Sequence, residues 1–303
     1  MIRLWNPYRR TLTEAIESND AAALEALFQQ GVNPNIILCE DGEVPLLKAA
    51  KRGCDRALHV ILEHGASVTA TDTWNNTALH YAAEAGKISC VHQLLQRGSP
   101  INALNYYEFT PLMQAVSSLH VDVVRHLILQ GASTTPKLNQ FNKSALTIAS
   151  QMGRVDILEL ILTVEAPIEY RRRELYASLT QAVLGGHVMV IEILLARGAP
   201  TDLLDTSIER PLHAAVRGGN KEIVYLLLFR GANIEAVDWY GYTPLMVATR
   251  SRNVDVVNVL LNEGADVNAA NSTTGETALS LAVKRGYTEI SDILLEALAA
   301  RAL

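Results

Sequence analysis

The sequence lacks the short motifs that mark common enzyme classes. It has no His-Glu-x-x-His zinc motif, no Gly-x-Ser-x-Gly nucleophile turn, no Gly-x-Gly-x-x-Gly dinucleotide loop and no phosphate-binding loop. Cys54, His59 and His64 are spread along one predicted helix, whereas a metal ion needs three or four ligands that converge on one point. We therefore predict no enzymatic activity, no metal site and no cofactor.

Cysteine, basic charge and long apolar runs are also scarce. The three cysteines, Cys39, Cys54 and Cys90, are an odd number without paired spacing. This favours reduced thiols and a cytoplasmic location, with a nuclear one left open. The net charge of −6 disfavours a general nucleic-acid binder. No apolar run approaches the length of a membrane span, and the first residues, MIRLWNPYRR, lack the apolar core of a signal peptide. We expect neither nucleic-acid binding nor membrane insertion.

The sequence does contain a repeated unit. Its clearest copy begins with a tight turn at Asp238–Gly241, where Asp bonds its own backbone and Gly tolerates positive φ. Thr243 is a good N-cap, and Pro244 occupies the first helical position, where its missing N–H costs nothing. A second helix carries apolar residues at helical spacing over Val254–Leu261 and stops at Gly264. The unit is a turn followed by two short helices and a loop.

The unit recurs along nearly the whole chain. The anchoring leucine of the first helix returns every 33 or 34 residues, at Leu12, Leu46, Leu79, Leu112, Leu146, Leu179, Leu212, Leu245 and Leu279. Each is followed three residues later by an alanine, at Ala15, Ala49, Ala82, Ala115, Ala149, Ala182, Ala215, Ala248 and Ala282. A fixed period of this length is typical of stacked repeats that share one continuous core.

The string TPL…A…VV…LL…GADVNA resembles an ankyrin repeat. The resemblance implies an all-α solenoid of stacked helix-turn-helix units, with β-turn fingers and a concave binding face formed by the finger tips and the first helices. We predict one domain over 1–303 with nine units, placed at 5–37, 38–70, 71–103, 104–137, 138–170, 171–203, 204–236, 237–270 and 271–303. The first unit lacks the turn and the proline and is predicted to be an N-terminal cap.

Four other units depart from the pattern, and in the fifth Glu165 replaces the loop glycine. The fourth has Leu119 where glycine is usual between the helices, which predicts a locally altered turn. The sixth lacks the proline and opens with the charged stretch 170–174, so we expect its finger to depart from the hairpin-like turn. This leaves open either drift or a finger reshaped for a partner. In the ninth, Leu298 replaces the helix-ending glycine, which fits a C-terminal cap helix or a natural chain that continues beyond Leu303.

Aromatic and basic residues gather at the positions that the repeat leaves free. Counted from the anchoring leucine, these positions lie eight, six, five and three residues before it and five and six after it. The aromatic set is Trp74, Tyr106, Tyr107, Phe109, Phe141, Tyr176, Trp239, Tyr240 and Tyr242, and the basic set is Arg171, Arg173, Arg217, Arg250, Lys284 and Arg285. Trp and Tyr are common in binding hot spots, and exposed aromatics reduce solubility unless a partner covers them. The alternative is that single tips only pack on the next finger.

These residues predict a protein–protein interaction module, monomeric alone, that binds a protein or an extended peptide with apolar anchors and acidic residues. Tyr106, Tyr107, Phe109 and Phe141 are expected to cluster, and the later arginines are expected to form a basic groove edged by aromatics. Two alternatives remain: the substrate-recognition part of a ubiquitin-ligase-type assembly, suggested by family analogy, and a structural adaptor without a single hot spot.

Overall fold

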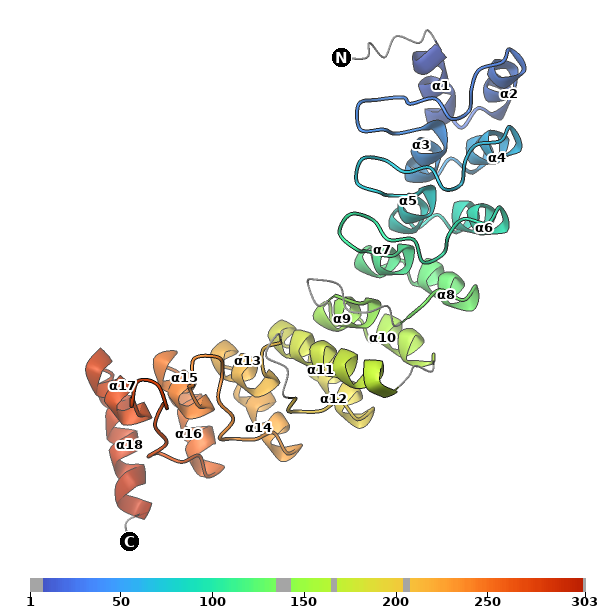
Figure 1. Ribbon diagram of the computed structural model, residues 1–303. Coiled ribbons are helices and arrows are strands. Elements are labelled where there is room, and N and C mark those ends of the chain that lie inside the picture. The colour runs from blue at the N-terminus through green and yellow to red at the C-terminus, as the bar shows by residue number, and fades with distance from the viewer. Residues whose placement is uncertain (1–7, 135–142, 165–167, 204–207, 302–303) are drawn as a thin grey trace. The chain divides into compact units, whose positions relative to one another are not determined.

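A computed structural model of the protein describes residues 8–134, 143–164, 168–203 and 208–301. This part of the chain contains 18 α-helices and no strand longer than an isolated bridge, which confirms the predicted all-α repeat class (Figure 1). Contacts between residues divide the chain into two compact units, Met1–Ala145 with Glu159–Glu165, and Leu146–Leu158 with Ala166–Leu303. The single domain and its nine boundaries stay predictions.

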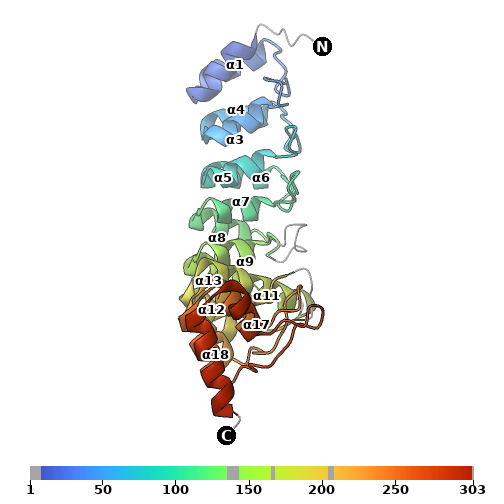
Figure 2. The ribbon, with the colours of Figure 1, turned by 90° about the vertical axis from the view of Figure 1, so that its left-hand side faces the viewer.

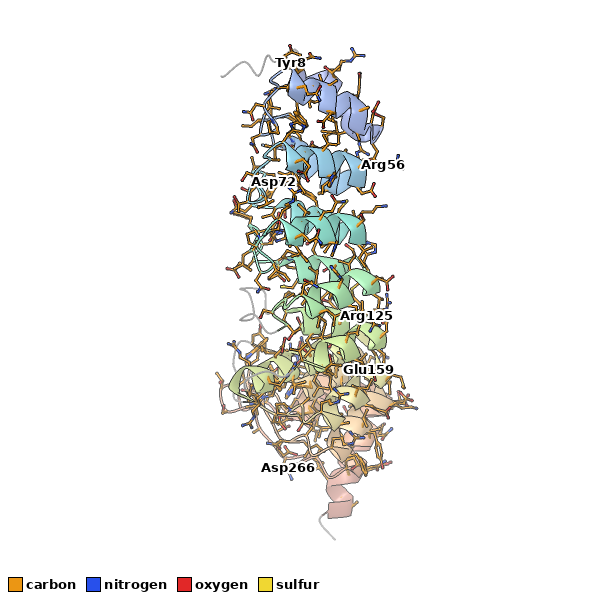
Figure 3. The ribbon with its side chains drawn as sticks, turned by 90° about the vertical axis from the view of Figure 1, so that its right-hand side faces the viewer. Tyr8, Arg56, Asp72, Arg125, Glu159 and Asp266 are labelled. Atoms are coloured by element: carbon orange, nitrogen blue, oxygen red, sulfur yellow. The ribbon has the colours of Figure 1, made fainter. Side chains whose placement is uncertain are left out.

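The first compact unit is built from helix pairs in two layers. Its pairs are α1 (Tyr8–Glu17) with α2 (Ala21–Gln29), α3 (Pro45–Arg52) with α4 (Asp55–Glu63), α5 (Ala78–Glu84) with α6 (Ile88–Gln96), and α7 (Pro111–Ser117) with α8 (Val121–Leu129). The first helices pack on one another, as do the second helices (Figures 1 and 2). The loops that lead into α3, α5 and α7 project as fingers along one edge. Asp72 marks that edge, whereas Arg56 and Arg125, on α4 and α8, lie at the opposite edge (Figure 3).

The same arrangement continues along the chain. The following helices are α9 (Ala145–Gln151), α10 (Val155–Leu162), α11 (Ile168–Gly185), α12 (Val188–Ala196), α13 (Pro211–Gly218), α14 (Lys221–Phe229), α15 (Pro244–Arg250), α16 (Val254–Asn262), α17 (Ala278–Arg285) and α18 (Thr288–Arg301). In the second compact unit, α11, α13, α15 and α17 form one layer, and α14, α16 and α18 pack side by side in the other.

The predicted anchors form the core. From Leu12 to Leu245 each anchoring leucine is at most 1% exposed, while Leu279 is only half-buried. The helix starts also follow the sequence: Thr110 and Thr243 cap α7 and α15 by accepting hydrogen bonds from backbone N–H groups, and a proline opens each of these helices. Side-chain burial and capping therefore specify the same helix pairs.

The turn between the two helices of each repeat is left-handed at one residue. These residues are Asn19, Gly53, Gly86, Leu119, Gly153, Gly186, Gly219, Arg252 and Gly286, with φ between 52° and 72°. Leu119 adopts φ 62°, and its N–H bonds to Val116 O at 3.0 Å, as the glycines do in other repeats. The expectation of an altered turn in the fourth repeat was wrong. The turn is kept, and a non-glycine residue there costs about 1–2 kcal/mol of backbone energy.

This left-handed turn gives a stability prediction. A Cβ added at Gly186 (φ 72°) or at the helical Gly218 would meet no atom within 4 Å, so only the backbone differs between the two sites. We expect Gly186→Ala to lower the free energy of unfolding by about 1 kcal/mol. Gly218→Ala, the matched control, is expected to raise it by about 0.5–1 kcal/mol because alanine favours a helix. Urea denaturation of both variants checks this, and equal effects would contradict it.

The sixth repeat has a helix where the second, third, fourth and eighth repeats have a finger. Helix α11 is 18 residues long, compared with seven or eight for α13 and α15. The stretch 171–175 contains no proline or glycine and consists of Arg, Glu and Leu, all good helix formers. Tyr176 therefore lies inside a helix and is fully buried. The expectation that the Tyr176 side chain is free on the surface was wrong, because α11 places it in the core.

Candidate partner-binding site

Four of the described fingers are closed by the side chain of their own Asp or Asn. Asn105 Oδ1 accepts hydrogen bonds from the backbone N–H groups of Tyr107 and Phe109 at 3.0 and 2.9 Å. Asp72 closes the preceding finger in the same way. Because Asp and Asn readily bond the backbone two residues on, this one residue fixes the conformation of the tip.

Neighbouring fingers are also bonded to each other. The N–H of Tyr106 donates to the carbonyl of Trp74 at 2.8 Å, and Asn105 Nδ2 donates to Asn76 Oδ1 at 2.9 Å. These bonds fix the spacing of two successive fingers. The side chains that the fingers carry are thus held in place in the free protein, which reduces the entropy lost on binding.

Three exposed aromatic side chains, Trp74, Tyr106 and Tyr107, form a cluster on these fingers, here called the aromatic cluster. The Trp74 and Tyr107 rings are nearly parallel, with centroids 6.0 Å apart, and Tyr106 meets them edge-on at 5.8 and 5.4 Å. Their exposed fractions are 48%, 63% and 47% in chain order. A large aromatic surface that is rigid and open to solvent is typical of a binding hot spot.

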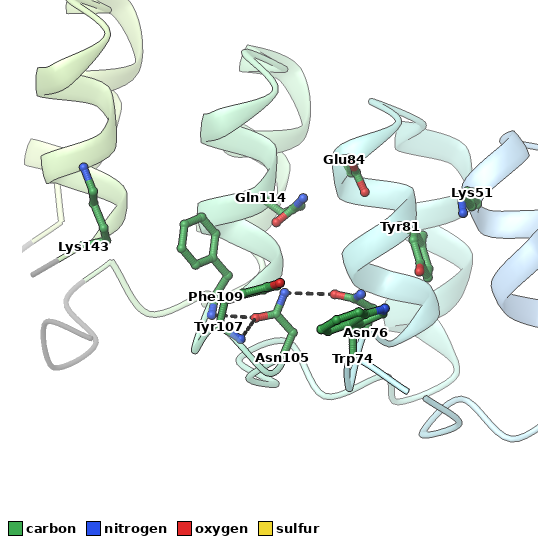
Figure 4. Close-up of a pocket in the computed structure, with 10 residues that line it drawn as sticks. All are labelled: Lys51, Trp74, Asn76, Tyr81, Glu84, Asn105, Tyr107, Phe109, Gln114 and Lys143. Carbon is green, nitrogen blue, oxygen red and sulfur yellow. Dashed lines mark hydrogen bonds between the residues drawn. The ribbon is translucent and has the colours of Figure 1, made fainter. Parts of the chain in front are cut away.

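A pocket of about 730 Å³ adjoins the aromatic cluster (Figure 4). We call it the aromatic pocket. It lies within the first compact unit, between two fingers and the first helices, and its lining residues are Lys51, Trp74, Asn76, Tyr81, Glu84, Asn105, Tyr107, Phe109, Gln114 and Lys143. Aromatic walls with a few amide and charged groups suit an apolar side chain of a peptide together with its backbone.

The polar groups of the aromatic pocket favour a neutral or acidic ligand. The Tyr81 hydroxyl donates to Asp72, and Lys51 Nζ lies 5.1 Å from the centroid of the Tyr81 ring. Burial and the hydrogen bond to Asp72 raise the pKa of Tyr81, so its hydroxyl stays protonated. Burial also lowers the pKa of Lys143. Two lysines, Lys51 and Lys143, line the pocket against one carboxylate, that of Glu84.

A second hollow, of about 390 Å³, lies in the second compact unit. Its lining residues are Arg217, Asp238, Tyr240, Val247, Arg250, Ser251 and Arg285. We call it the arginine hollow. The sequence had assigned its three arginines to one basic groove with Tyr240 at its edge, and the structure brings these four residues together.

The other residues predicted for this groove lie around the hollow. Lys284 forms an ion pair with Glu276 at 2.8 Å. Tyr242 is half-buried: its ring lies 4.3 Å below the Arg250 guanidinium, and its hydroxyl donates to Glu276 at 3.3 Å. Trp239 is 56% exposed on the finger tip but does not line the arginine hollow. Lys284 and Tyr242 are thus engaged in local pairs that the sequence did not reveal.

The earlier predicted residues divide in the same way. Trp74, Tyr107 and Phe109 line the aromatic pocket, and Tyr106 completes the aromatic cluster. Phe141 lies outside the described residues, so its predicted place beside them stays a prediction.

The basic residues of α11 line neither the aromatic pocket nor the arginine hollow. Arg171 is half-buried and pairs with the buried Glu174 at 3.5 Å. Arg173 is exposed, and neither arginine lines the aromatic pocket or the arginine hollow. Their assignment to a partner-binding finger depended on a finger that α11 replaces.

Two pocket residues were missed because one repeat position was left out. Tyr81 and Gln114 each lie two residues after the anchoring leucine. A helix turns by about 100° per residue, so this position, at about 200°, falls between the free positions five and six residues after the leucine, at about 140° and 240°. The positions two, five and six residues after the anchoring leucine therefore share one helix face. The helical period could thus have pointed to Tyr81 and Gln114.

Two buried histidines join repeats rather than forming a reactive site. His80 Nε2 donates to the carbonyl of Phe109 at 2.9 Å, and its Nδ1 accepts from the N–H of Thr77 at 3.2 Å. His213 Nε2 donates to the carbonyl of Tyr242 at 3.0 Å. Each histidine thus ties a first helix to the base of the next finger. Burial lowers the pKa of both, although the hydrogen bond to the carbonyl opposes this.

These histidines predict a loss of stability in mild acid. In the unfolded chain a histidine titrates near 6.5, whereas His80 and His213 titrate lower in the folded protein, so the unfolded state takes up protons first as the pH falls. Their contribution is present above pH 6.5 and is lost below it, with a slope of at most about 1.4 kcal/mol per pH unit per histidine. Urea denaturation at pH 7 and pH 5 measures the loss.

The matching control separates these groups from the carboxylates. The double variant His80→Gln, His213→Gln is expected to have a shallower pH dependence, and His59→Gln, at an exposed histidine, is expected to leave it unchanged. If all three proteins lose stability in parallel, the histidines are not responsible.

Comparison with known proteins agrees with this architecture. A family model described as ankyrin repeats (3 copies) matches residues 12–105, 101–174 and 179–271. Because these matches cover most of the sequence, the protein belongs to the ankyrin-repeat family, whose members are generally protein–protein interaction modules and typically not enzymes. Among curated proteins, none matches the chain. Within the described ranges, no helix has both the length and the apolar character needed to cross a membrane.

Proposed function

We propose that this protein is an interaction module that holds a protein or an extended peptide, and that the aromatic pocket receives an apolar side chain of that partner. The aromatic cluster is the observation that supports this most strongly. Trp74, Tyr106 and Tyr107 are all exposed although the repeat needs no aromatic residue at their positions. Hydrogen bonds between the fingers fix the positions of these three side chains in the free protein. Exposed aromatics of this kind are covered when a partner binds.

Acidic residues beside the anchor fit the charges of both hollows. Lys51 and Lys143 outnumber the single carboxylate of the aromatic pocket, and three arginines line the arginine hollow. Positive charges at a binding surface attract an oppositely charged partner during encounter and select against basic ones. A partner segment at the aromatic pocket therefore carries an apolar anchor beside acidic groups, and a segment at the arginine hollow carries acidic groups.

The proposed role is binding without catalysis, in a reducing compartment such as the cytoplasm. The two buried histidines of the first helices are engaged in hydrogen bonds between repeats. The three cysteines carry free thiols, and Cys54 and Cys90 are buried. Burial raises the pKa of Cys54 and of Cys90, the latter to about 12, which keeps these thiols protonated and unreactive.

Site-specific photo-crosslinking tests the proposal. The full chain is expressed in its source cell with p-benzoylphenylalanine at Tyr107, and a control carries the same group at Tyr225, which is 54% exposed on α14. We expect one protein to be crosslinked at Tyr107 but not at Tyr225, through a segment that contains an apolar side chain next to Asp or Glu. The same proteins crosslinked equally at both positions, or none at Tyr107, would overturn the proposal.

A further inference from the structure

We propose that the arginine hollow binds a phosphorylated side chain of a partner polypeptide. This inference rests on the proposed function only in that the occupant belongs to a protein partner. The site is separate from the aromatic pocket and lies in the other compact unit. A phosphorylation-dependent contact would make binding at this end of the chain conditional on the state of the partner.

The three arginines meet because the repeat brings equivalent helix ends together. Arg217 and Arg250 lie 33 residues apart in the last turns of α13 and α15, and Arg285 lies in the last turn of α17. These three helices pack side by side in order. One arginine from each of three successive repeats therefore lines the same 390 Å³ hollow.

The acidic groups near the hollow leave it positively charged. Asp238 is the one carboxylate that lines it, and its Oδ1 already accepts the N–H groups of Tyr240 and Tyr242, both at 2.9 Å. Glu209, which does not line the hollow, pairs with Arg217 at 2.9 Å. Burial raises the pKa of Glu209, so this partner is held in its charged form less firmly than an exposed carboxylate. Three arginines thus face two carboxylates, of which one is bound to the finger.

Three arginines from three successive repeats match a phosphoryl group better than a carboxylate. A carboxylate has two oxygens in one plane, and a single guanidinium can satisfy both through two parallel hydrogen bonds. A phosphorylated side chain has three terminal oxygens in a tetrahedral arrangement and a charge between about −1.5 and −2. It can therefore accept bonds from several guanidinium groups at once, which is why arginine clusters recognise phosphorylated segments.

The surroundings favour a polypeptide over a free anion. Another hollow, of about 350 Å³, shares Arg217 with the arginine hollow and is bordered by Gly185, Gly186 and Ala214, which leave room for an extended backbone. Tyr240, which lines the arginine hollow, and its neighbour Trp239 are 70% and 56% exposed on the finger tip and can cover a neighbouring apolar side chain. A phosphate ion alone would use neither feature.

A purely local role for these arginines is also testable. Basic residues in the last turn of a helix are favoured by the helix dipole, whether or not a ligand binds. Lysine retains that interaction but lacks the planar fork that binds an oxygen pair. Lys284 gives a matched control, because it lies in the same turn of α17 as Arg285, pairs with Glu276 and does not line the hollow.

Fluorescence polarisation of the full chain with labelled peptide pools tests the inference. Each pool has a fixed central phosphoserine or phosphotyrosine with randomised flanks, and matched pools carry serine, tyrosine or glutamate at the centre. We expect one phosphorylated pool to bind at least about tenfold more tightly than its unmodified and glutamate counterparts, as two or more added charge-assisted hydrogen bonds would give. Arg250→Lys and Arg285→Lys should lose most of this difference, and Lys284→Gln should keep it.

Each contrary result overturns the inference. Equal binding of phosphorylated and glutamate pools would mean that only net charge matters. Competition by inorganic phosphate at the concentration of the peptide would mean a simple anion site, and competition by vesicles containing phosphatidylinositol phosphates would mean a membrane ligand. Loss of the preference in Lys284→Gln as well would mean a general effect of charge. Thermal melting of each lysine variant confirms that it is folded.

The proposed function is tested separately. The double variant Trp74→Ala, Tyr107→Ala should bind the phosphorylated pool like the wild type, because the aromatic pocket lies in the other compact unit. If the pools show no preference while Tyr107 still crosslinks a partner, the inference about phosphorylation fails and the interaction module stands.

Discussion

Replacing Leu112 by alanine is expected to lower the free energy of unfolding by about 2–5 kcal/mol. Leu112 is fully buried in α7, which packs against both α5 and α8. Removing most of its side chain loses the transfer free energy of the missing carbons and leaves a cavity that helices held on two sides cannot close. Urea denaturation followed by circular dichroism measures the loss.

The damage should stay near the fourth repeat. In a repeat array each unit contacts only its neighbours, so stability is close to a sum of local terms. Hydrogen exchange should show lost protection in α5 to α8 and nearly unchanged protection in α13 to α16. Leu279→Ala, at the same repeat position but half-buried, is the control and should cost clearly less. Uniform loss of protection along the chain would contradict local coupling.

Residues that recur in every repeat made the fold predictable from sequence. The anchoring leucines and their alanines are needed wherever one helix pair packs on the next. The same core residues therefore recur in each repeat of the sequence. The caps follow the same logic: Thr243 and Pro244 serve α15 just as Thr110 and Pro111 serve α7. A contact that repeats can be inferred from its period without knowing any distance.

Single departures from the repeat were harder to interpret. Leu119 stands where most repeats have glycine between the two helices, but the turn keeps its shape. The two packed helices impose this turn, and the backbone strain is tolerated. Tyr176 stands at a finger position when counted from the anchoring leucine of its repeat. The charged stretch before it favours a helix, however, and Tyr176 is buried in α11. In both cases the spacing from the anchoring leucine indicated where the residue lies in the repeat. It did not indicate the local conformation.

The residues that line the two hollows depend on pairing between side chains of neighbouring repeats. The repeat period does not indicate this pairing. Arg217 and Lys284 both satisfy the rule for a free position, and each has an acidic neighbour. Arg217 nevertheless borders the arginine hollow while Lys284 does not. Such differences arise from rotamers and from the residues opposite, so sequence reasoning could nominate the set but could not select its members.

The aromatic pocket carries the largest expected effect on binding. Trp74 and Tyr107 present nearly parallel rings, and both line the pocket, so a partner that fills it covers both at once. Removing them deletes a large contact area whose orientation was fixed in advance by the finger bonds. Since both rings are about half exposed in the free protein, the same change should cost little stability.

We therefore expect the double variant Trp74→Ala, Tyr107→Ala to weaken binding of the segment crosslinked at Tyr107 by at least about 2 kcal/mol, or about 30-fold. Isothermal titration calorimetry of wild type, both single variants and the double variant measures this and gives the coupling between the rings, expected at about 0.5–1.5 kcal/mol for an aromatic pair. The control, Tyr225→Ala with Phe229→Ala, removes two exposed aromatics from α14 and should leave the affinity unchanged. Equal losses in the two double variants would show that exposed aromatic area in general, and not the aromatic pocket, holds the partner.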